Sequence, residues 1–371
     1  MELDRMLKLM VDKKASDLFI TAGLPPSMKV NGTIHPITKE AWSPEKARET
    51  VLGAMNESQR KEFMLSHECN FAISARGVGR FRVSAFYQRN LVGMVLRRIE
   101  TQIPTSGSLG LPPIIDELAM TKRGLVLFVG ATGTGKSTSI ASMIGYRNEN
   151  SNGHIISIED PIEYVHQHKG CIVTQREVGI DTESFEVALR NTLRQAPDVI
   201  LVGEIRTRET MEQSIIFADT GHLCMATLHA NNANQALGRI LNFFPADRHD
   251  QVWMDLSLNL KAIVAQQLVP TVDGKGRQIV TEVMINTPVI ADHIRKGEAH
   301  LLKDIMTRST EIGMQTFDQS LFKAYKAGKI SYEAALKHAD SMNDLRLMIK
   351  LDSGELIEQS KSAASQFTIQ E

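Results

Sequence analysis

A glycine-rich motif in the first half of the chain constrains the fold more than any other feature. Residues 125–129, Leu-Val-Leu-Phe-Val, form an apolar run that predicts a short buried strand. Residues 130–137 then fit the pattern G-x-x-x-x-G-K-[ST], and helical spacing follows from Thr138 to Ile144. Strand, glycine loop and helix therefore come in the order of a P-loop, which binds phosphates at a helix N-terminus.

Each residue type in this motif has a chemical role. Glycines let the backbone turn sharply, so that several N–H groups point at one anion. We expect Lys136 to reach the β- and γ-phosphates of ATP and the Ser137 hydroxyl to ligate Mg²⁺. The expected nucleotide-binding residues are Gly130, Ala131, Thr132, Gly133, Thr134, Gly135, Lys136, Ser137 and Thr138.

Length and composition are those of an ordinary globular protein with room for two domains. The chain has 371 residues, of which 42% are hydrophobic and 23% charged. The formal net charge is −1, so no general basic field argues for nucleic acid. The apolar runs are shorter than a membrane span, so we expect no direct membrane insertion and a membrane role only through a partner.

The cysteines are few and scattered. Cys69, Cys171 and Cys224 form no C-x-x-C pair, which argues against both a zinc site and a disulfide framework. We therefore expect three buried thiols in a protein of the reducing cytoplasm.

The first 99 residues predict a small α+β domain. Apolar residues at helical spacing occupy residues 1–13, and Ser43-Pro44 is typical of a helix start with a second helix over 57–66. Asn31-Gly32 is a hairpin signal. Strands are expected at residues 18–21, 27–30, 69–75, 79–87 and 91–99.

The rest of the chain predicts an α/β domain followed by helices. Residues 100–113 contain three prolines and two glycines and are the expected linker or hinge. Within the domain expected over 114–286, apolar strands at 125–129, 154–158, 199–202 and 223–227 alternate with helices at about 137–148, 184–195 and 207–219. This alternation indicates a parallel sheet covered on both faces. After Asn231 we expect mainly helices, interrupted by a hairpin around 273–276. Residues 287–350 should form a helical subdomain and 351–371 a disordered tail.

A P-loop enzyme needs carboxylates near the phosphates, and one candidate strand carries an acid at each end. Asp198 and Glu204 flank the apolar run 199–202 and lie about 20 Å apart at ~3.3 Å per residue. Ligands of parallel sheets bind at the carboxyl ends of the strands. We therefore expect Glu204 to reach the nucleotide and Asp198 to be structural.

A second acidic segment, Ile158-Glu-Asp-Pro-Ile-Glu163, also follows an apolar strand. Its three carboxylates would repel phosphates unless a metal or an activated water required them. We assign the general base to Glu163 and the ordering of Mg²⁺ waters to Glu159 and Asp160. The alternative is a solvated acidic turn.

Two histidines bracket the strand at 223–227. His229 lies at its carboxyl end and is a candidate sensor of the γ-phosphate, whereas His222 lies at the opposite end. Either histidine alone would more often be a hydrogen-bonded structural residue.

Residues 76–98 carry six arginines and no acid. Arg80 and Arg82 are two residues apart on an expected strand and so share a face. An unpaired arginine face binds anions. The partner could be the phosphates of a neighbouring subunit or an acidic face of the P-loop domain, which the residues alone do not rank. Nucleic acid is the least favoured, because the arginines lack interleaved aromatics.

Four motifs together resemble one family. Residues 130–138, 158–163, 201–204 and 220–229 resemble the Walker A motif, Asp box, Walker B motif and His box of the secretion-superfamily ATPases. The resemblance spans about residues 1–340. It implies a PAS-like N-terminal domain, a RecA-like ATPase domain and a cytoplasmic homohexamer. It also implies that Arg80 and Arg82 reach the next subunit's nucleotide.

Within that family the chain is similar to the pilus retraction branch. The tetracysteine segment typical of assembly and secretion ATPases is missing, and Val289–Lys296 keeps only Ile290, Ile294 and Arg295 of a motif known from the retraction ATPase PilT. The resemblance thus implies an accessory motor that works with a PilT-like paralogue and with an inner-membrane platform protein in pilus retraction and twitching motility. The alternatives are a nucleotide-bound regulatory ring with little activity of its own, and a pilus assembly or type II secretion ATPase.

Overall fold

The computed structural model describes residues 2–353. Of the disordered tail expected at 351–371, residues 351–353 are instead the end of a helix, and the rest lies outside the described residues. Contacts divide the chain into two units. The first unit comprises residues 1–103, 159–167 and 175–188, and the second comprises 104–158, 168–174 and 189–371. Residues 159–167 and 175–188, which lie within the sequence range expected for the P-loop domain, thus group with the N-terminal residues.

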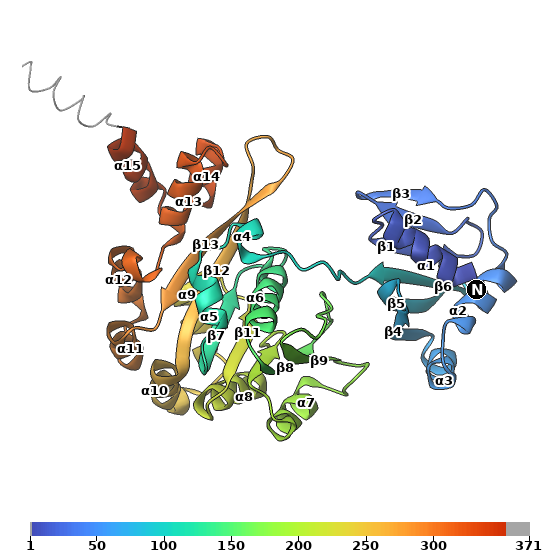
Figure 1. Ribbon diagram of the computed structural model, residues 1–371, viewed down its shortest axis with the longest axis horizontal. Helices are drawn as coiled ribbons and strands as arrows, with labels where there is room; N and C mark the ends of the chain where they lie inside the picture. The colour runs from blue at the N-terminus through green and yellow to red at the C-terminus, as the bar shows by residue number, and fades with distance from the viewer. Residues whose placement is uncertain (1, 354–371) are drawn as a thin grey trace, which may run out of the picture. The chain divides into compact units, whose positions relative to one another are not determined.

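The first unit contains a six-stranded sheet with three helices. The strand order is β3-β2-β1-β6-β5-β4 (Figure 1). The elements are α1 (Glu2–Asp12), β1 (Asp17–Thr21), β2 (Ser27–Val30), β3 (Thr33–Pro36), α2 (Pro44–Gly53), α3 (Glu57–Ser66), β4 (Glu68–Ala75), β5 (Gly79–Gln88) and β6 (Leu91–Arg98).

Local sequence signals explain these elements. Ser43 caps α2 by accepting a hydrogen bond from the Lys46 N–H, and Pro44 occupies the first helical position. Asn31 and Gly32 both have positive φ, as a two-residue hairpin between β2 and β3 requires. The expected strands and helices of this region are confirmed.

The core of the first unit lies on one face of its sheet. On β5, Phe81, Val83 and Ala85 are buried in one cluster with residues of all three helices, such as Met10, Val51 and Phe63. Side chains alternate along a strand, so Arg80 and Arg82 share the opposite face, as their spacing predicted.

The second unit is built on a seven-stranded sheet with the order β13-β12-β7-β11-β10-β8-β9. Strands β8, β10, β11, β7 and β12 run parallel to one another, and β13 is antiparallel to β12. The strands are β7 (Gly124–Val129), β8 (Gly153–Glu159), β9 (Cys171–Glu177), β10 (Val199–Val202), β11 (Leu223–Leu228), β12 (Leu260–Pro270) and β13 (Arg277–Ile285).

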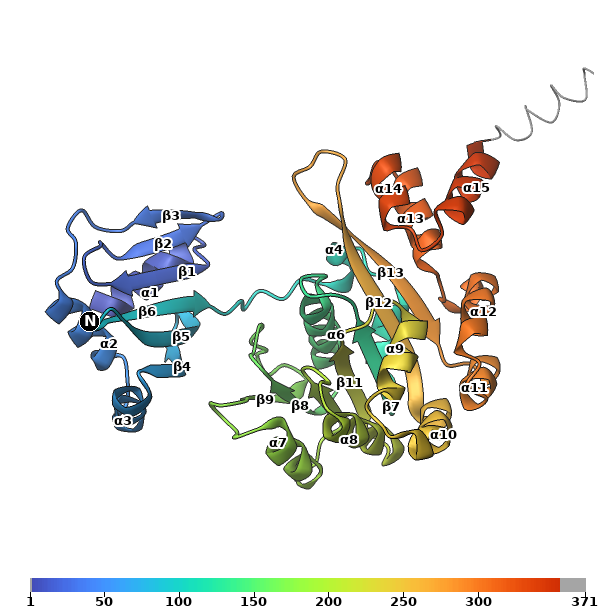
Figure 2. The ribbon, with the colours of Figure 1, turned by 180° about the vertical axis from the view of Figure 1, so that it is seen from behind.

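Helices cover both faces of this sheet, as expected (Figures 1 and 2). Val126 and Phe128 of β7 pack in one cluster with Ile115 and Ile140 from α5 and α6. On the opposite face, α8 packs against β11, whose Cys224 is fully buried. The helices are α4 (Ser106–Leu109), α5 (Ile114–Ala119), α6 (Lys136–Asn150), α7 (Phe185–Thr192), α8 (Arg208–Asp219), α9 (Ala233–Leu241) and α10 (His249–Asn259).

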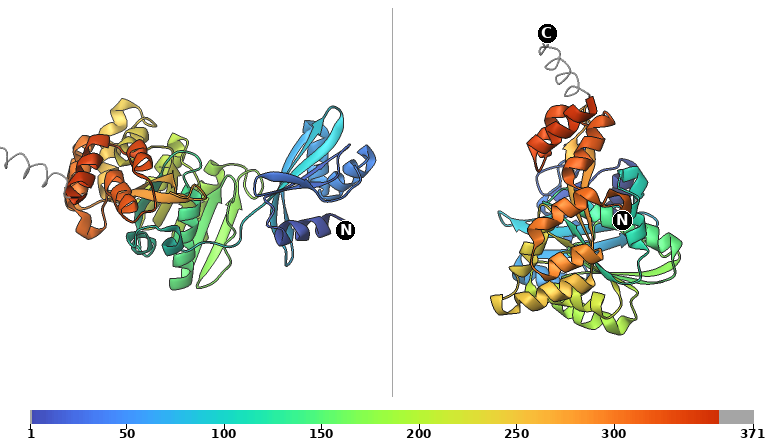
Figure 3. Two further views of the ribbon diagram at one scale, coloured as in Figure 1. Left: turned by 90° about the horizontal axis from the view of Figure 1, so that it is seen from above. Right: turned by 90° about the vertical axis from the view of Figure 1, so that its left-hand side faces the viewer.

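Within residues 286–353, five helices follow the last strand (orange to red in Figure 3), and two of them contact the β12–β13 hairpin. The five helices are α11 (Pro288–Arg295), α12 (Leu302–Arg308), α13 (Phe317–Lys326), α14 (Tyr332–His338) and α15 (Met342–Ser353). The hairpin around 273–276 was expected, but its strands also join the main sheet, which the mainly helical interpretation of this region did not include. Strand β9 was also not predicted.

The three cysteines are buried free thiols, as expected. Among residues 2–353, none of the helices combines the length and apolar character needed to cross a membrane.

Candidate active site

The P-loop connects β7, which is buried throughout, to the first turn of α6. Two of its glycines leave no room for a side chain. A Cβ on Gly130 would lie 2.6 Å from Thr134 Oγ1 and 2.7 Å from the Gln266 carbonyl, and a Cβ on Gly135 would lie 2.8 Å from Gln266 Nε2. Both glycines also have positive φ, of 152° and 88°. The backbone therefore forms a tight cradle that only glycine permits.

Lys136 lies inside this cradle. Its side chain is buried, and Nζ donates hydrogen bonds to the carbonyls of Gly130 at 2.7 Å and Ala131 at 2.9 Å. Ser137 follows on the exposed side of the first helical turn. The loop is thus closed around an ammonium group at the N-terminus of a 15-residue helix, where anions are favoured.

Gln266 on β12 supports the loop from the neighbouring strand and was not predicted. Its buried amide donates to the Thr134 carbonyl at 2.6 Å and accepts from the Ser139 hydroxyl at 2.8 Å. The available signal was a polar pair, Gln266-Gln267, inside the apolar run 262–269.

Glu204 and His229 form a hydrogen-bonded pair. Glu204 lies two residues after β10, His229 directly follows β11, and the Glu204 Oε1 to His229 Nε2 distance is 2.7 Å. The adjacent, parallel strands β10, β11 and β7 bring their carboxyl ends, and with them the P-loop, to the same edge of the sheet. The structure thus brings together three groups that the sequence singled out.

The turn that carries Glu204 is held against β11. The Thr227 hydroxyl donates to the Gly203 carbonyl at 2.6 Å, and the Ile205 N–H donates to the Thr227 carbonyl at 2.8 Å. Arg206 Nε donates to the second carboxylate oxygen of Glu204 at 2.7 Å. Arg206 was not predicted, because an exposed arginine after a strand has no distinguishing pattern.

The two residues at the opposite ends of these strands are structural, as expected. Asp198 accepts a hydrogen bond from the His154 N–H at 2.8 Å at the start of β10. His222 Nδ1 lies 3.3 Å from the Phe217 carbonyl, beside the start of β11.

The acidic segment belongs to the first unit. Glu159 Oε1 accepts from Gln175 Nε2 at 3.1 Å, and the same amide donates to the Tyr164 carbonyl at 2.9 Å. Asp160 and Glu163 are exposed. Glu163 lines a recess of about 290 Å³ together with three arginines, Arg82, Arg97 and Arg98.

Arg80 has carboxylate partners in its own chain. Its Nη2 lies 3.7 Å from both Glu177 Oε2 and Asp181 Oδ2. Burial raises the pKa of Glu177, and the nearby charges of Arg80 and Arg82 partly offset this effect. The charge of Arg82 also acts on Glu177, and Arg82 lines the recess together with Glu163.

Within residues 2–353, no cluster of three or more His, Cys, Asp or Glu side chains is arranged to hold a metal by itself. Mg²⁺ in nucleotide sites needs few protein ligands, because phosphates and waters supply the rest. The glycine cradle and the exposed Ser137 at the first turn of α6 fit a magnesium–nucleotide complex.

The fold and this site define a P-loop ATPase. A family profile described as "Type II/IV secretion system protein" matches residues 2–336, and the chain belongs to this family. It is 75% identical over 353 residues to the type IV pilus ATPase PilU of Pseudomonas aeruginosa, covering 95% of this chain and 92% of that protein. The type IV pilus retraction ATPase PilT of the same organism is 39% identical over 339 residues, covering 91% of this chain and 98% of that protein.

The structural comparison agrees. The crystal structure of the pilus retraction motor PilT with bound ADP superposes with a TM-score of 0.86 at 41% identity, covering 93% of this chain and 98% of that one. The expected fold class, an N-terminal α+β PAS-like domain followed by a RecA-like ATPase domain and C-terminal helices, is therefore confirmed. The resemblance to the pilus retraction branch is confirmed as well.

Proposed function

We propose that this chain is a hexameric motor ATPase that couples ATP hydrolysis to type IV pilus retraction, as the accessory partner of a PilT-like ATPase. The observation that carries the proposal is the Glu204–His229 pair beside an intact P-loop. A protein that had lost its catalytic function would have no need to keep both groups at the phosphate end of the sheet. The 75% identity to PilU supports the accessory role.

In this proposal the P-loop residues bind and orient the phosphates of ATP. Lys136 exchanges its two carbonyl acceptors for β- and γ-phosphate oxygens, and the Ser137 hydroxyl, with Glu159 and Asp160 through water, holds Mg²⁺. Mg²⁺ supplies neutralisation of the phosphate charge when it is bound.

Three side chains act on the reacting end of the nucleotide. Glu163 takes a proton from the attacking water, and its exposed carboxylate is free to approach a ligand. Glu204 holds His229 through the 2.7 Å hydrogen bond, so that the imidazole faces the γ-phosphate. Loss of the γ-phosphate would then change the position of His229.

Arg80 and Arg82 act in trans on the nucleotide of a neighbouring subunit. Arg82 lines an arginine-rich recess, which supports this role. Arg80 would have to leave Glu177 and Asp181 to do the same. Guanidinium groups of this kind stabilise the charge that develops during phosphoryl transfer.

Movement between domains would convert hydrolysis into work. Residues 100–113 are the proposed hinge between the N-terminal domain and the ATPase core, and the helices after residue 287 form a third part. The ring would act in the cytoplasm on an inner-membrane platform protein, without binding nucleic acid.

The test is ATP turnover per subunit as a function of protein concentration. We expect turnover to rise steeply with concentration in the wild type, because the arginines of one subunit complete the site of the next. Arg82→Ala should lose turnover while its subunits still bind ATP. A wild-type rate that stays at background at every concentration would contradict the motor proposal and favour a regulatory ring. An unchanged kcat in Arg82→Ala would refute the shared site.

A further inference from the structure

The segment that carries His229 is short and is fixed at both ends. It begins at the end of β11 and continues into α9, whose capping residue is Asn232. Asn232 Oδ1 accepts from the Gln235 N–H at 2.9 Å, and Gln235 Oε1 accepts from the Asn231 N–H at 3.3 Å. Only Ala230 separates this capped turn from His229, so the position of the helix start determines where the imidazole lies.

The start of α9 is fastened to β13 by one buried contact. The Ala233 N–H, at the first position of the helix, donates to Glu282 Oε1 at 2.8 Å. Both residues are almost fully buried, with 1% and 3% of their surface exposed. A helix has unpaired N–H groups in its first turn, and a carboxylate there satisfies one of them and also complements the helix dipole.

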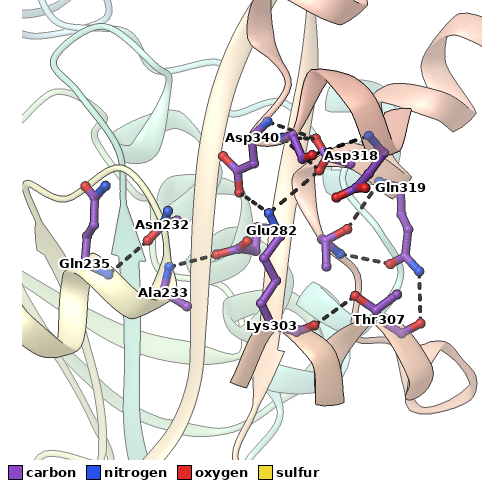
Figure 4. A network of polar contacts seen from close by, with 12 residues as sticks. Asn232, Ala233, Gln235, Glu282, Lys303, Thr307, Asp318, Gln319 and Asp340 are labelled. Atoms are coloured by element: carbon purple, nitrogen blue, oxygen red, sulfur yellow. Dashed lines mark hydrogen bonds and ion pairs between the residues drawn. The ribbon is translucent and has the colours of Figure 1, made fainter. Parts of the chain in front are cut away.

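The same carboxylate borders a polar pocket between α9 and the C-terminal helices. The pocket has a volume of about 300 Å³ and is lined by Glu282, Lys303 and Asp340, among others. Lys303 Nζ lies 3.1 Å from Asp340 Oδ2 and 3.7 Å from Asp318 Oδ2. Asp318 in turn accepts from the Asp340 N–H at 2.9 Å (Figure 4).

From these contacts we propose that Glu282 is a positioning residue for His229, while the polar network around Lys303 borders the same pocket. The inference rests on the proposed catalytic function of the Glu204–His229 pair. Glu282 does not touch the nucleotide in this scheme. It acts through the Ala233 N–H and the capped turn, and so fixes the distance between His229 and Glu204.

Two substitutions remove the Ala233–Glu282 hydrogen bond from opposite sides. Glu282→Leu removes the acceptor at similar volume. Ala233→Pro removes the donor at a helix position where proline is accepted, and the extended backbone of Asn232 suits a following proline. Glu282→Gln keeps an acceptor oxygen and is the conservative variant. Glu298→Leu is the control, because its carboxylate is half-exposed and bonds to His293 and not to the start of α9.

The experiment is steady-state ATP hydrolysis by these variants, alone and combined with His229→Ala. We expect Glu282→Leu and Ala233→Pro each to lower kcat about tenfold, with KM for ATP within about twofold of wild type. Glu282→Gln and Glu298→Leu should keep wild-type kcat. In the His229→Ala background Glu282→Leu should cause no further loss, because both changes remove one function.

The outcomes separate this inference from the function on which it rests. If His229→Ala lowers kcat but both Ala233→Pro and Glu282→Leu leave it unchanged, the positioning role of Glu282 is wrong and the proposed function stands. Losses that multiply in the double variant would also overturn the positioning role. A normal kcat in His229→Ala would overturn the catalytic role of the pair itself. Circular dichroism and ATP binding verify that each variant is folded. If Glu282→Leu does not fold, the kcat of Ala233→Pro alone tests the positioning role.

Discussion

The contact between Gln266 and the P-loop yields a quantitative prediction. In Gln266→Leu the side chain keeps about the same volume but loses both hydrogen bonds, those to the Thr134 carbonyl and the Ser139 hydroxyl. All three groups lie at the junction of β12, the loop and the first turn of α6, and the amide is 1% exposed. Water therefore has little access to replace the lost partners.

The expected cost follows from what remains unpaired. A buried polar group without a partner costs about 1–3 kcal/mol. Ser139 can turn its hydroxyl to the Gly135 carbonyl one helical turn earlier, which recovers part of the loss. We therefore expect about 2 kcal/mol of destabilisation of the phosphate-binding conformation, which weakens nucleotide binding roughly 30-fold at 1.4 kcal/mol per factor of ten.

The assay is the Kd for ATP, measured by isothermal titration calorimetry with hydrolysis blocked by omission of Mg²⁺. Gln267→Leu is the matched control, because the neighbouring side chain points to the other face of β12 and bonds to His338. It should bind ATP as the wild type does. A Kd within twofold of wild type in folded Gln266→Leu would show that the loop keeps its shape without this support.

Three further predictions concern the loop, the lysine and the buried glutamate. Gly135→Ala should abolish ATP binding, whereas Gly133→Ala should weaken it less, because a Cβ at Gly133 meets nothing within 4 Å and costs only the positive φ; calorimetry of the two variants compares them. Lys136→Ala should reduce turnover to background in a phosphate-release assay, and residual activity above a few per cent would contradict its assigned role. Burial raises the pKa of Glu282 to about 7, even with Lys303 nearby. The folded protein therefore holds the proton of Glu282 more tightly than the unfolded chain does. The stability that this gives is fully present below pH 4.5 and is lost as the pH rises through 7. Glu282→Gln should therefore raise Tm relative to wild type by several degrees at pH 8, because it removes a destabilisation of up to about 3 kcal/mol, and it should not raise Tm at pH 5. Equal differences in Tm at both pH values would refute the assignment.

The sequence predicted those parts of the site that are carried by local motifs. Gly130 to Ser137 encode the loop within eight residues, and Glu204 and His229 each follow an apolar strand directly. In a parallel sheet the carboxyl ends of neighbouring strands meet, so the sequence positions alone brought these groups to one edge. Their 2.7 Å contact also depends on β10 and β11 being neighbours in the sheet, which the sequence did not predict.

The supporting residues depend on pairings that no local pattern encodes. Gln266 lies more than a hundred residues after the loop that it supports, and it reaches Thr134 only because β12 pairs with β7. The β12 sequence reads equally well as part of an apolar helix, so this pairing was not predicted. For Arg80 the sequence left open an acidic face of the P-loop domain as the partner, but it did not single out Glu177 and Asp181, because they lie in a segment whose packing has no local signal.

The β12–β13 hairpin connects these missed residues. Ala265 pairs with Glu282 and Gln266 pairs with Thr281, so the two polar side chains are neighbours in one ladder and point to opposite faces of the sheet. Gln266 supports the phosphate loop on the face covered by α6, and Glu282 fastens α9 on the other face. The C-terminal helices contact both strands of the hairpin, α13 on β13, which carries Glu282, and α14 on β12, which carries Gln266. A change in the hairpin would therefore alter ATP binding through Gln266 and the position of His229 through Glu282. Because these contacts are separate, substitution of Gln266 should change the Kd for ATP, whereas substitution of Glu282 should change kcat.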